Sequence, residues 1–535
     1  MKGEKNMKNM SKFTLMLTLV ASLAVTGCIK ETFPQGGSAT IEQMTGNSKA
    51  FESLVRGIPG YLQQPTTHAG QHYELGYPAM VTIREMLSND VAIENIGYEW
   101  FGAWHENQYQ GENYIYGQYI WNYYTECVMN CNKVILFDEG ENTPDENIAN
   151  IGAAYAYRAM LWLDMGQMYE FKANKYTSQD AIIGLTIPHL HENLTEAEAR
   201  NNPRLPKAEL VELIRADLTK AIEYTHGRER WSISFPGEAV AYGLLARLEM
   251  WNEDYAAAKA AAEKAIELSG CTPLTEEQWT DTTTGFNSAS SQNSWMLALC
   301  LTDESPSVKT GILNIASWFS SETYFGYCGA GAFRKADALF YSNIPDADFR
   351  KLSWKAPEGS ALDVPMLPAT GYYSPDNLPE LAGVKFRPGG GNTDDYLIGA
   401  KTDFPLMRVE EMHFIVAECD ARNGNFESLA NFMRSYRNPY YNIPSDNVDK
   451  VVSEVLFQKR VEFWMEGVSF FDFKRCPEYQ QILRGYNGTN HYPDSCLNCE
   501  GLAPWMNLCF VQTETNQNPA LVNNPDPSQT VPLWK

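Results

Sequence analysis

The fold follows from residues 238–268, which read EAVAYGLLARLEMWNEDYAAAKAAAEKAIEL. Apolar side chains recur at helical spacing in the first half of this stretch, among them Tyr242, Leu245 and Met250. A polar turn at residues 252–254 follows, and the second half carries alanine at the positions that repeat with the helical period. Because small side chains let paired helices approach closely, this stretch predicts a helical hairpin.

The predicted hairpin resembles a tetratricopeptide repeat. A shift of 171 residues superimposes a second copy, in which Ala417 matches Ala246 and Leu429 matches Ala258. One such repeat cannot bury its apolar face alone. We therefore predict a mainly α protein built on a scaffold of stacked helical hairpins.

Two further segments, residues 152–169 and 207–225, have apolar residues at helical spacing and no internal proline. With the two hairpins they place the helical scaffold at about residues 120–268 and 405–475. Three long stretches around it are dense in Gly, Pro, Asn, Ser, Thr and aromatic residues: 172–206, 270–405 and 476–535. Their aromatic content argues against disorder, so we expect loop-rich inserts that form a ligand surface on a tetratricopeptide-like scaffold.

The first residues have the pattern of a secretory signal. Four lysines in the first dozen residues precede an apolar run of 13 residues, Phe13–Val25, which is too short to span a membrane. The run ends in Val25-Thr26-Gly27-Cys28, which resembles a bacterial lipobox. We predict that residues 1–27 are removed and that Cys28 is acylated, which would anchor residues 28–535 to a membrane. Ordinary signal cleavage beside a chance cysteine is the alternative.

The net charge limits the class of ligand that the chain can bind, and the cysteine content raises the question of disulfides. The formal net charge of −24 and pI near 4.8 argue against nucleic-acid binding and favour a neutral ligand. The ten cysteines after Cys28 would meet an oxidising compartment, where disulfides can form. For Cys496 and Cys499, in a C-x-x-C, a structural bridge is favoured over redox or metal chemistry. Cys127 and Cys131 are predicted to be core thiols.

Four separated motifs resemble one family. They are Ser88-Asn89-Asp90 followed by tryptophans, Tyr157-Arg158-Ala159 with Met168-Tyr169, a helix from Pro405-Leu406-Met407-Arg408 to Ala417-Glu418, and Gln458–Gly467 continuing to Phe471–Arg475. Together they resemble the SusD/RagB-like nutrient-uptake lipoproteins of Bacteroidetes, and Ile29-Lys30-Glu31 is similar to their surface-export tether. The resemblance implies an outer-membrane, cell-surface lipoprotein that binds oligosaccharide and lies as a lid over a SusC-like TonB-dependent transporter.

The charged residues near the last motif allow two readings. Arg460, Glu462, Glu466, Asp472 and Arg475 could form a catalytic carboxylate set, but their alternating charges among bulky aromatics favour an ion-pair network that fixes a helix to the scaffold. We expect no enzyme activity and no cofactor.

Metal sites find little support in the sequence. His105-Glu106 and His189-Leu190-His191-Glu192 lack the second helical-turn partner of a zinc site. Calcium stays open, because the oxygen-rich pairs Asp346/Asp348 and Asp394/Asp395 do not follow a complete loop pattern.

Ligand contacts are expected in two aromatic-rich segments, because a sugar needs a flat apolar face together with hydrogen-bonding groups. Residues 90–114 supply both, in the region where the family carries ligand contacts, and the family again places binding residues in an insert such as 279–327. The predicted ligand-binding residues are Asp90, Trp100, Trp104, Asn107, Trp279, Trp295, Trp318, Tyr324 and Tyr327. The alternative is that these aromatics belong to the core.

Other functions stay open from the sequence. A member of the same family could capture peptides, a tetratricopeptide scaffold could bind only proteins, and a surface glycosidase needs only two carboxylates at the right separation.

Overall fold

The computed structural model describes residues 48–370 and 374–528. The predicted signal peptide (1–27) and lipidation site Cys28 lie outside the described residues. The chain divides into two units, residues 1–53 and 54–535. The described part of the first unit is the start of helix α3 (Ser48–Leu62), where the Ser53 hydroxyl donates to the Lys49 carbonyl at 2.8 Å. The account below concerns the second unit.

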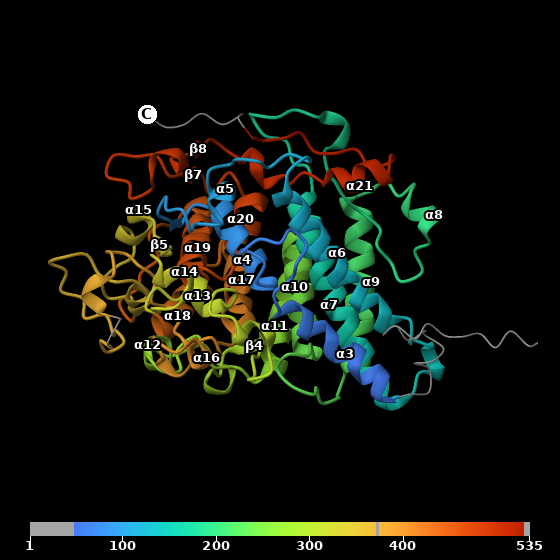
Figure 1. The fold of residues 1–535 in the computed structure, drawn as a ribbon, viewed down its shortest axis with the longest axis horizontal. Coiled ribbons are helices and arrows are strands. Elements are labelled where there is room, and N and C mark those ends of the chain that lie inside the picture. Colours follow the sequence, from blue (N-terminus) through green and yellow to red (C-terminus); the bar gives the residue numbers. More distant parts are fainter. Residues whose placement is uncertain (1–47, 371–373, 529–535) are drawn as a thin grey trace, which may run out of the picture. The chain divides into compact units, whose positions relative to one another are not determined.

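A series of packed helices forms the scaffold. Its members are α4 (Tyr77–Leu87), α6 (Ile115–Ile135), α7 (Asp145–Tyr169), α9 (Lys207–Thr225), α10 (Glu238–Asn252), α11 (Tyr255–Ser269), α17 (Val409–Arg422), α18 (Glu427–Tyr436), α19 (Val448–Glu462) and α20 (Ser469–Arg475). Consecutive members pack against each other from α6 through α7, α9, α10 and α11 to α17, and α17 contacts both α18 and α19 (Figure 1). The predicted mainly α class is confirmed.

The predicted hairpin is the pair α10 and α11. Helix α10 ends at Asn252, and the next residue, Glu253, turns the chain with a left-handed φ of 65°. Asp254 then caps α11 by accepting from the Ala257 N–H at 3.0 Å. Four alanines of α11 are buried: Ala258, Ala261, Ala262 and Ala265. The second copy folds in the same way as α17 and α18. The spacing of small residues therefore predicted both hairpins correctly.

Glycine lets α7 lie close to its neighbours. A Cβ atom at Gly166 would stand 2.8 Å from a Leu210 methyl carbon on α9 and 3.0 Å from the Trp251 ring on α10. Both distances are shorter than an ordinary carbon–carbon contact, so a larger residue at Gly166 would require the Leu210 and Trp251 side chains to move.

The strands are short and form two-stranded antiparallel pairs. They are β1 (Val91–Ala92) with β5 (Lys335–Ala336), β2 (Leu185–Pro188) with β3 (Arg204–Pro206), β4 (Trp295–Leu299) with β6 (Phe404–Arg408), and β7 (Ile482–Leu483) with β8 (Asn498–Cys499). The prediction that Pro405–Arg408 opens a helix is wrong, because these residues pair as a strand with β4, more than 100 residues earlier in the chain.

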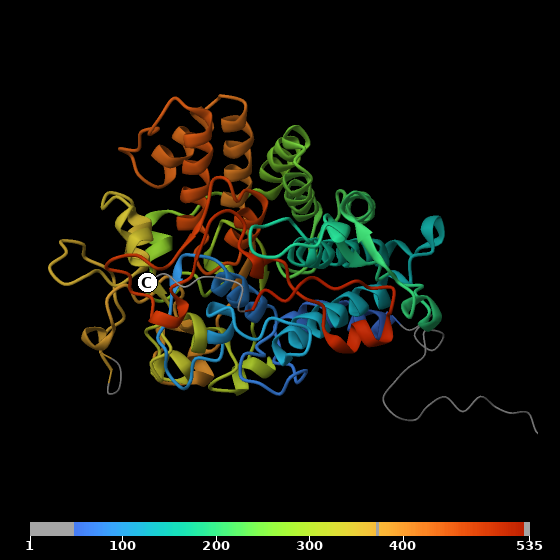
Figure 2. The same cartoon turned by 90° about the horizontal axis from the view of Figure 1, so that it is seen from above.

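The inserts combine loops with short helices. These are α5 (Gly102–His105), α8 (Glu196–Ala199), α12 (Glu276–Thr280), α13 (Ile315–Phe319), α14 (Gly326–Gly329), α15 (Ala338–Ser342), α16 (Tyr396–Gly399) and α21 (Gln512–Gln517). Figure 2 shows the C-terminal insert crossing over several of the scaffold helices. Among the described residues, no helix is both long and apolar enough to cross a membrane.

A buried ion-pair network joins the scaffold to the middle insert. The Glu462 carboxylate, at the end of α19, accepts from Arg350 at 3.2 Å, Arg408 at 3.0 Å and Arg437 at 2.7 Å. All four side chains are fully buried. Nearby, Arg475 pairs with Glu418 and Asp472, and Glu466 pairs with Arg408. The ion-pair interpretation of this charged motif is confirmed.

The expectation that Cys496 and Cys499 take part in a structural bridge is wrong. All ten cysteines of the described chain are free thiols. The Cys496 thiol points to the His491 and Tyr492 carbonyls, and burial raises the pKa of Cys499 to about 12. Cys127 and Cys131 are buried on α6, as predicted.

We expect Glu462→Gln to lower the free energy of unfolding by about 3–5 kcal/mol, because it removes the carboxylate that three buried guanidinium groups share and leaves their charges only partly compensated by Asp348, Glu410 and Glu466. Burial alone would raise the pKa of Glu462, but Arg437, Arg408 and Arg350 hold it well below its usual range. Chemical denaturation at neutral pH measures the loss. The control is Glu196→Gln in the exposed Glu196–Arg200 pair, with an expected change within about 0.5 kcal/mol. Equal stability of the two variants would contradict the role given to the network.

Candidate ligand-binding site

The pairing of β1 with β5 brings together two segments that are far apart in the sequence. Val91 lies opposite Ala336, and Ala92 lies opposite Lys335. This register places the residues that follow β1 beside those that precede β5. The two predicted aromatic segments therefore meet in part, and the Phe101 and Trp318 rings lie 5.0 Å apart.

We use the name aromatic face for His72, Trp100 and Tyr327, whose rings are in contact, together with Tyr98 and Tyr324, which lie two and three residues from Trp100 and Tyr327 in the chain. Tyr98 is 60% exposed and Tyr324 is 48% exposed, while His72 and Trp100 are partly buried. The His72 ring lies 4.7 Å from Trp100 and 5.9 Å from Tyr327, and its Nδ1 atom is hydrogen-bonded to the Tyr327 hydroxyl. The face thus offers flat apolar rings next to groups that can form hydrogen bonds.

A second layer of rings supports the aromatic face from below. Trp318, which is fully buried, stacks on Tyr327 with centroids 4.1 Å apart and an interplanar angle of 17°. Phe101 meets Trp318 edge to face at 5.0 Å. Burial raises the pKa of Tyr327, with a smaller contribution from nearby Tyr98, so its hydroxyl stays protonated and can donate. Such packing fixes the ring positions before a ligand arrives.

The charged side chains beneath the face are paired. Arg334 binds Glu99 and lies over the Phe101 and Trp318 rings, 5.7 and 5.2 Å from their centroids. Lys335 pairs with Glu94. The cations and carboxylates of the two segments neutralise each other, so this arrangement suits a neutral ligand.

Three of the predicted ligand-binding residues lie in the aromatic face, namely Trp100, Tyr324 and Tyr327. Trp318 lies directly beneath it and is fully buried, so the expectation that it contacts ligand is corrected. The binding role of Trp100, Tyr324 and Tyr327, which come from both predicted segments, stays a prediction.

The placement of Trp104, Trp279 and Trp295 corrects the expectation that they offer open stacking surfaces. Each is buried, with at most 2% of its surface exposed. Trp104 meets the Tyr73 ring edge to face at 5.0 Å. Trp279 donates to the Ser353 hydroxyl at 2.9 Å and contacts the cations around Glu462. These tryptophans are core residues, as the alternative interpretation held.

Asp90 and Asn107 also have structural partners. The buried Asp90 carboxylate accepts from Arg460 Nε at 2.7 Å and also from Arg460 Nη2. Asn107 adopts a left-handed φ of 51° and donates to the Pro527 carbonyl at 2.9 Å. Because both groups face the protein interior, the expectation that they contact ligand is corrected.

His72 is the residue of the face that the sequence did not indicate. It lies in the loop between α3 and α4, without aromatic neighbours on its N-terminal side, so no local pattern marked it. Tyr98 lies within the predicted 90–114 segment but was not among the predicted ligand-binding residues.

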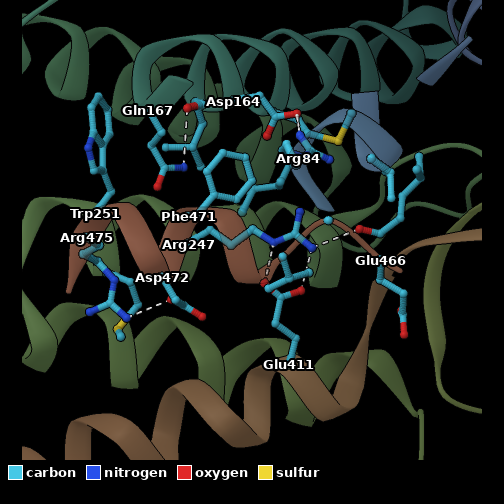
Figure 3. A pocket seen from close by; sticks show the side chains of 18 of the residues that line it. Arg84, Asp164, Gln167, Arg247, Trp251, Glu411, Glu466, Phe471, Asp472 and Arg475 are labelled. Carbon is cyan, nitrogen blue, oxygen red and sulfur yellow. Dashed lines mark hydrogen bonds and ion pairs between the residues drawn. The ribbon is translucent and has the colours of Figure 1, made fainter. Parts of the chain in front are cut away.

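Figure 3 shows a separate interior cavity between α4, α7, α10, α17 and α20. Its charged groups are paired across the cavity: Arg84 with Asp164 at 2.8 Å, and Arg247 with Glu411. The free volume of about 50 Å³ leaves room for a few water molecules but not for a sugar. We assign this cavity to the packing of the scaffold.

The oxygen-rich pairs considered for calcium are engaged by the protein. Asp348 binds Arg350, Asp346 binds Lys351, and Asp395 caps α16 by accepting from the Leu397 N–H. Within the described part of the chain, no three His, Cys, Asp or Glu side chains are grouped as a metal site would require.

Comparison with known proteins gives two consistent results. Residues 384–526 match the model of the SusD family. A SusD-like carbohydrate-binding protein from Bacteroides vulgatus has the same fold at 19% identity and a TM-score of 0.68, covering 88% of this chain and 97% of its own. The chain thus has the SusD-like fold, and its residues 384–526 are similar to the SusD family.

Two further structures agree with this result. A SusD superfamily protein from Bacteroides thetaiotaomicron aligns at 16% identity and a TM-score of 0.65, over 89% of this chain and 99% of its own. A SusD-like carbohydrate-binding protein from Bacteroides fragilis aligns at 14% identity and a TM-score of 0.62, over the same shares. No curated protein sequence matches the chain. At these identities the likeness to solved structures establishes the fold alone. The aromatic face lies outside residues 384–526, the part of the chain that matches the family model.

A buried histidine pair fastens the C-terminal insert beneath the aromatic segment. His105 Nε2 lies 3.1 Å from His491 Nδ1, and the two rings are stacked. His105 Nδ1 is hydrogen-bonded to the Met86 carbonyl, and Arg484 donates to the His105 carbonyl at 2.7 Å. Burial lowers the pKa of both histidines, and the Arg484 charge lowers them further, although Asp337 opposes the shift at His491. Both rings are therefore neutral at pH 7.

We expect the stability of the SusD-like chain to fall as the pH drops below about 6.5, the usual pKa of histidine in an unfolded chain. A histidine with a lowered pKa in the folded state binds fewer protons there than when unfolded, so acid favours unfolding. The slope is at most about 1.4 kcal/mol per pH unit for each histidine. Denaturation of wild type and His105→Asn between pH 7.5 and 5.5 should show a shallower slope in the variant.

The control for this experiment is His226→Asn, because the His226 side chain is 77% exposed. It should keep the wild-type slope. A His105→Asn slope equal to that of wild type would show that the buried pair does not titrate with unfolding.

Proposed function

We propose that this chain is a lipid-anchored protein of the bacterial outer-membrane surface that binds a neutral oligosaccharide at the aromatic face and passes it intact to a SusC-like TonB-dependent transporter. The contact of three rings from three separate segments of the chain, His72, Trp100 and Tyr327, carries the proposal. Names of two structures with the same fold, both described as SusD-like carbohydrate-binding proteins, support the ligand class. The lipobox at Cys28 supports the anchor.

The chemistry of the aromatic face fits a sugar. Tyr98 and Tyr324 expose ring surface on which the C–H side of a sugar can stack, and His72 with the Tyr327 hydroxyl can serve its hydroxyl groups. The paired charges beneath the face leave little attraction for an anionic ligand. The carboxylates that could suggest hydrolysis, Glu462 and Glu466, are instead bound to arginines in the interior.

A peptide could also stack on these rings, so the ligand class needs a direct comparison. Titration calorimetry with a panel of neutral oligosaccharides (maltoheptaose, cellohexaose, xylohexaose and mannohexaose) and a set of proline- and aromatic-containing peptides separates the two. Binding of peptides alone would replace the glycan proposal with peptide capture.

We expect the double variant Trp100→Ala/Tyr324→Ala to bind the preferred oligosaccharide about 5- to 150-fold more weakly. Loss of two stacking rings is commonly worth about 1–3 kcal/mol together, and 1.4 kcal/mol is tenfold in Kd. The unfolding free energy should change little, because neither ring is fully buried. Calorimetry gives the Kd, and chromatography after long incubation should recover the sugar intact.

Two controls accompany this variant. Tyr440→Ala removes a ring that is 77% exposed elsewhere and should leave binding unchanged. Trp104→Ala should instead destabilise the protein by about 3–5 kcal/mol, as expected for a fully buried aromatic. Unchanged affinity in the double variant would place the binding site elsewhere, and steady product release would indicate a glycosidase.

We expect Cys28→Ala to release the protein from the membrane fraction, because the acyl chains on this cysteine would be its anchor. Fractionation and immunoblotting of cells that express each form measure the effect. Retention of the variant in the outer membrane at the wild-type level would contradict the lipid anchor.

A further inference from the structure

The loop between β2 and β3 carries a groove that the proposed function does not use. It spans residues 189–203, includes the short helix α8, and has a free volume of about 420 Å³. Six side chains supply its main chemistry: His189, His191, Leu194, Glu198, Asn201 and Asn202. This groove includes the two histidines whose spacing in the sequence did not complete a zinc site.

Two imidazole rings form one wall of the groove. The rings of His189 and His191 lie 4.6 Å apart, and the Trp162 ring meets His189 edge to face at 5.4 Å. Burial lowers the pKa of His189 to about 4, helped by His191 and Arg158, so His189 is neutral at pH 7. A neutral imidazole offers one donor and one acceptor together with a flat ring face.

The remaining polar groups of the groove are held in place by the protein. The Asn202 amide donates to the His189 carbonyl at 2.9 Å, and its backbone N–H donates to the Asn518 side chain at 3.0 Å. Glu198 accepts from the Thr195 N–H at 2.9 Å, and this hydrogen bond lowers its pKa, which keeps it an acceptor. The His191 Nδ1 atom accepts from the Asn193 N–H at 3.3 Å, which directs its other nitrogen, as a donor, away from the backbone.

Other polar atoms of the groove are open to a ligand. Within the described residues, the His189 ring nitrogens and the Asn201 side-chain amide have no hydrogen-bonding partner in the protein. Donors and acceptors thus lie beside the apolar Leu194 side chain and two ring faces. This combination suits the hydroxyl groups and C–H face of a sugar, and the single formal charge, on Glu198, disfavours an anion.

We propose that the β2–β3 groove is a second binding site for a neutral sugar unit, separate from the aromatic face. The inference rests on the proposed function only in taking the ligand to be an oligosaccharide. Figures 1 and 2 both show α8 well apart from α13 and α14, so the two sites lie on different parts of the second unit. Two sites on one chain would retain a long glycan more strongly than either site alone, because the second contact is intramolecular.

The test uses the full-length mature chain with 13C label at histidine Cε1, because the chain has only 8 histidines and their signals can be assigned by substitution. The neutral oligosaccharide panel named above is titrated into wild type and into Trp100→Ala/Tyr324→Ala. We expect the His189 and His191 signals to shift in both proteins. When His189→Ala/His191→Ala is added to Trp100→Ala/Tyr324→Ala, the Kd for the oligosaccharide should rise at least tenfold above that of Trp100→Ala/Tyr324→Ala. Glu196→Ala, on α8 outside the groove, is the matched control and should leave that binding unchanged.

The outcomes separate the two proposals. If the sugars bind at the aromatic face while the His189 and His191 signals stay still, the second site is wrong and the proposed function stands. If those signals shift but the aromatic substitutions have no effect on affinity, the groove binds sugar and the aromatic face does not. If no sugar of the panel binds wild type, both proposals fall.

Discussion

The structure depends on the carboxylate of Glu462. This one buried group compensates Arg350 from the middle insert, Arg408 from β6 and Arg437 from the end of α18. A buried guanidinium without a carboxylate is costly. Glu462 is the carboxylate that all three arginines share, and Asp348, Glu410 and Glu466 complete the pairing, so each of these segments has a low-energy position where it reaches this group. The network therefore determines where the long middle insert meets the helical scaffold.

The same requirement governs the charged groups near the aromatic face. Asp90 pairs with Arg460 of α19, Glu99 with Arg334 and Glu94 with Lys335. The Asp90 pair holds the start of β1 against α19, the Glu94 and Glu99 pairs hold the segment after β1 against residues 334 and 335, and each pair is neutral overall. The ion pairs support the rings of the aromatic face without involving the ring atoms. The surface that these rings present is therefore determined by stacking and hydrogen bonding.

Some aromatic residues of this chain belong to the core and others lie at the surface. The composition of the segments that contain them does not distinguish the two groups. Trp279 lies against the arginines around Glu462, whereas Trp100 lies at the surface beside His72. Both occur in segments rich in aromatic and polar residues. What separates them is the pairing of β1 with β5, which turns one group of rings outward, and the contact of α12 with the ion-pair network, which buries the other. Neither contact is local in the sequence.

The histidine pair and the β2–β3 groove show how the inserts gain rigidity without regular secondary structure. His105 and His491 join segments almost 400 residues apart through a ring contact, and Arg484 adds a hydrogen bond to the His105 carbonyl. Asn202 and Asn518 join the β2–β3 loop to the end of α21 in a similar way. In both places, side-chain hydrogen bonds take over the role that backbone ladders have in a sheet.

The sequence by itself determined the helical scaffold, because the periodicity of apolar and small residues at 238–268 and its copy near 409–436 is a local property of the chain. It also determined the family resemblance and the prediction of ion pairs in residues 460–475, since alternating charges among bulky aromatics are expected to be buried and buried charges need partners. Only the tertiary structure decided that Pro405–Arg408 is a strand, that Cys496 and Cys499 stay reduced, and which rings reach the surface. Strand partners, thiol separation and burial all depend on contacts between residues distant in sequence, and spacing along the chain carries no information about such contacts.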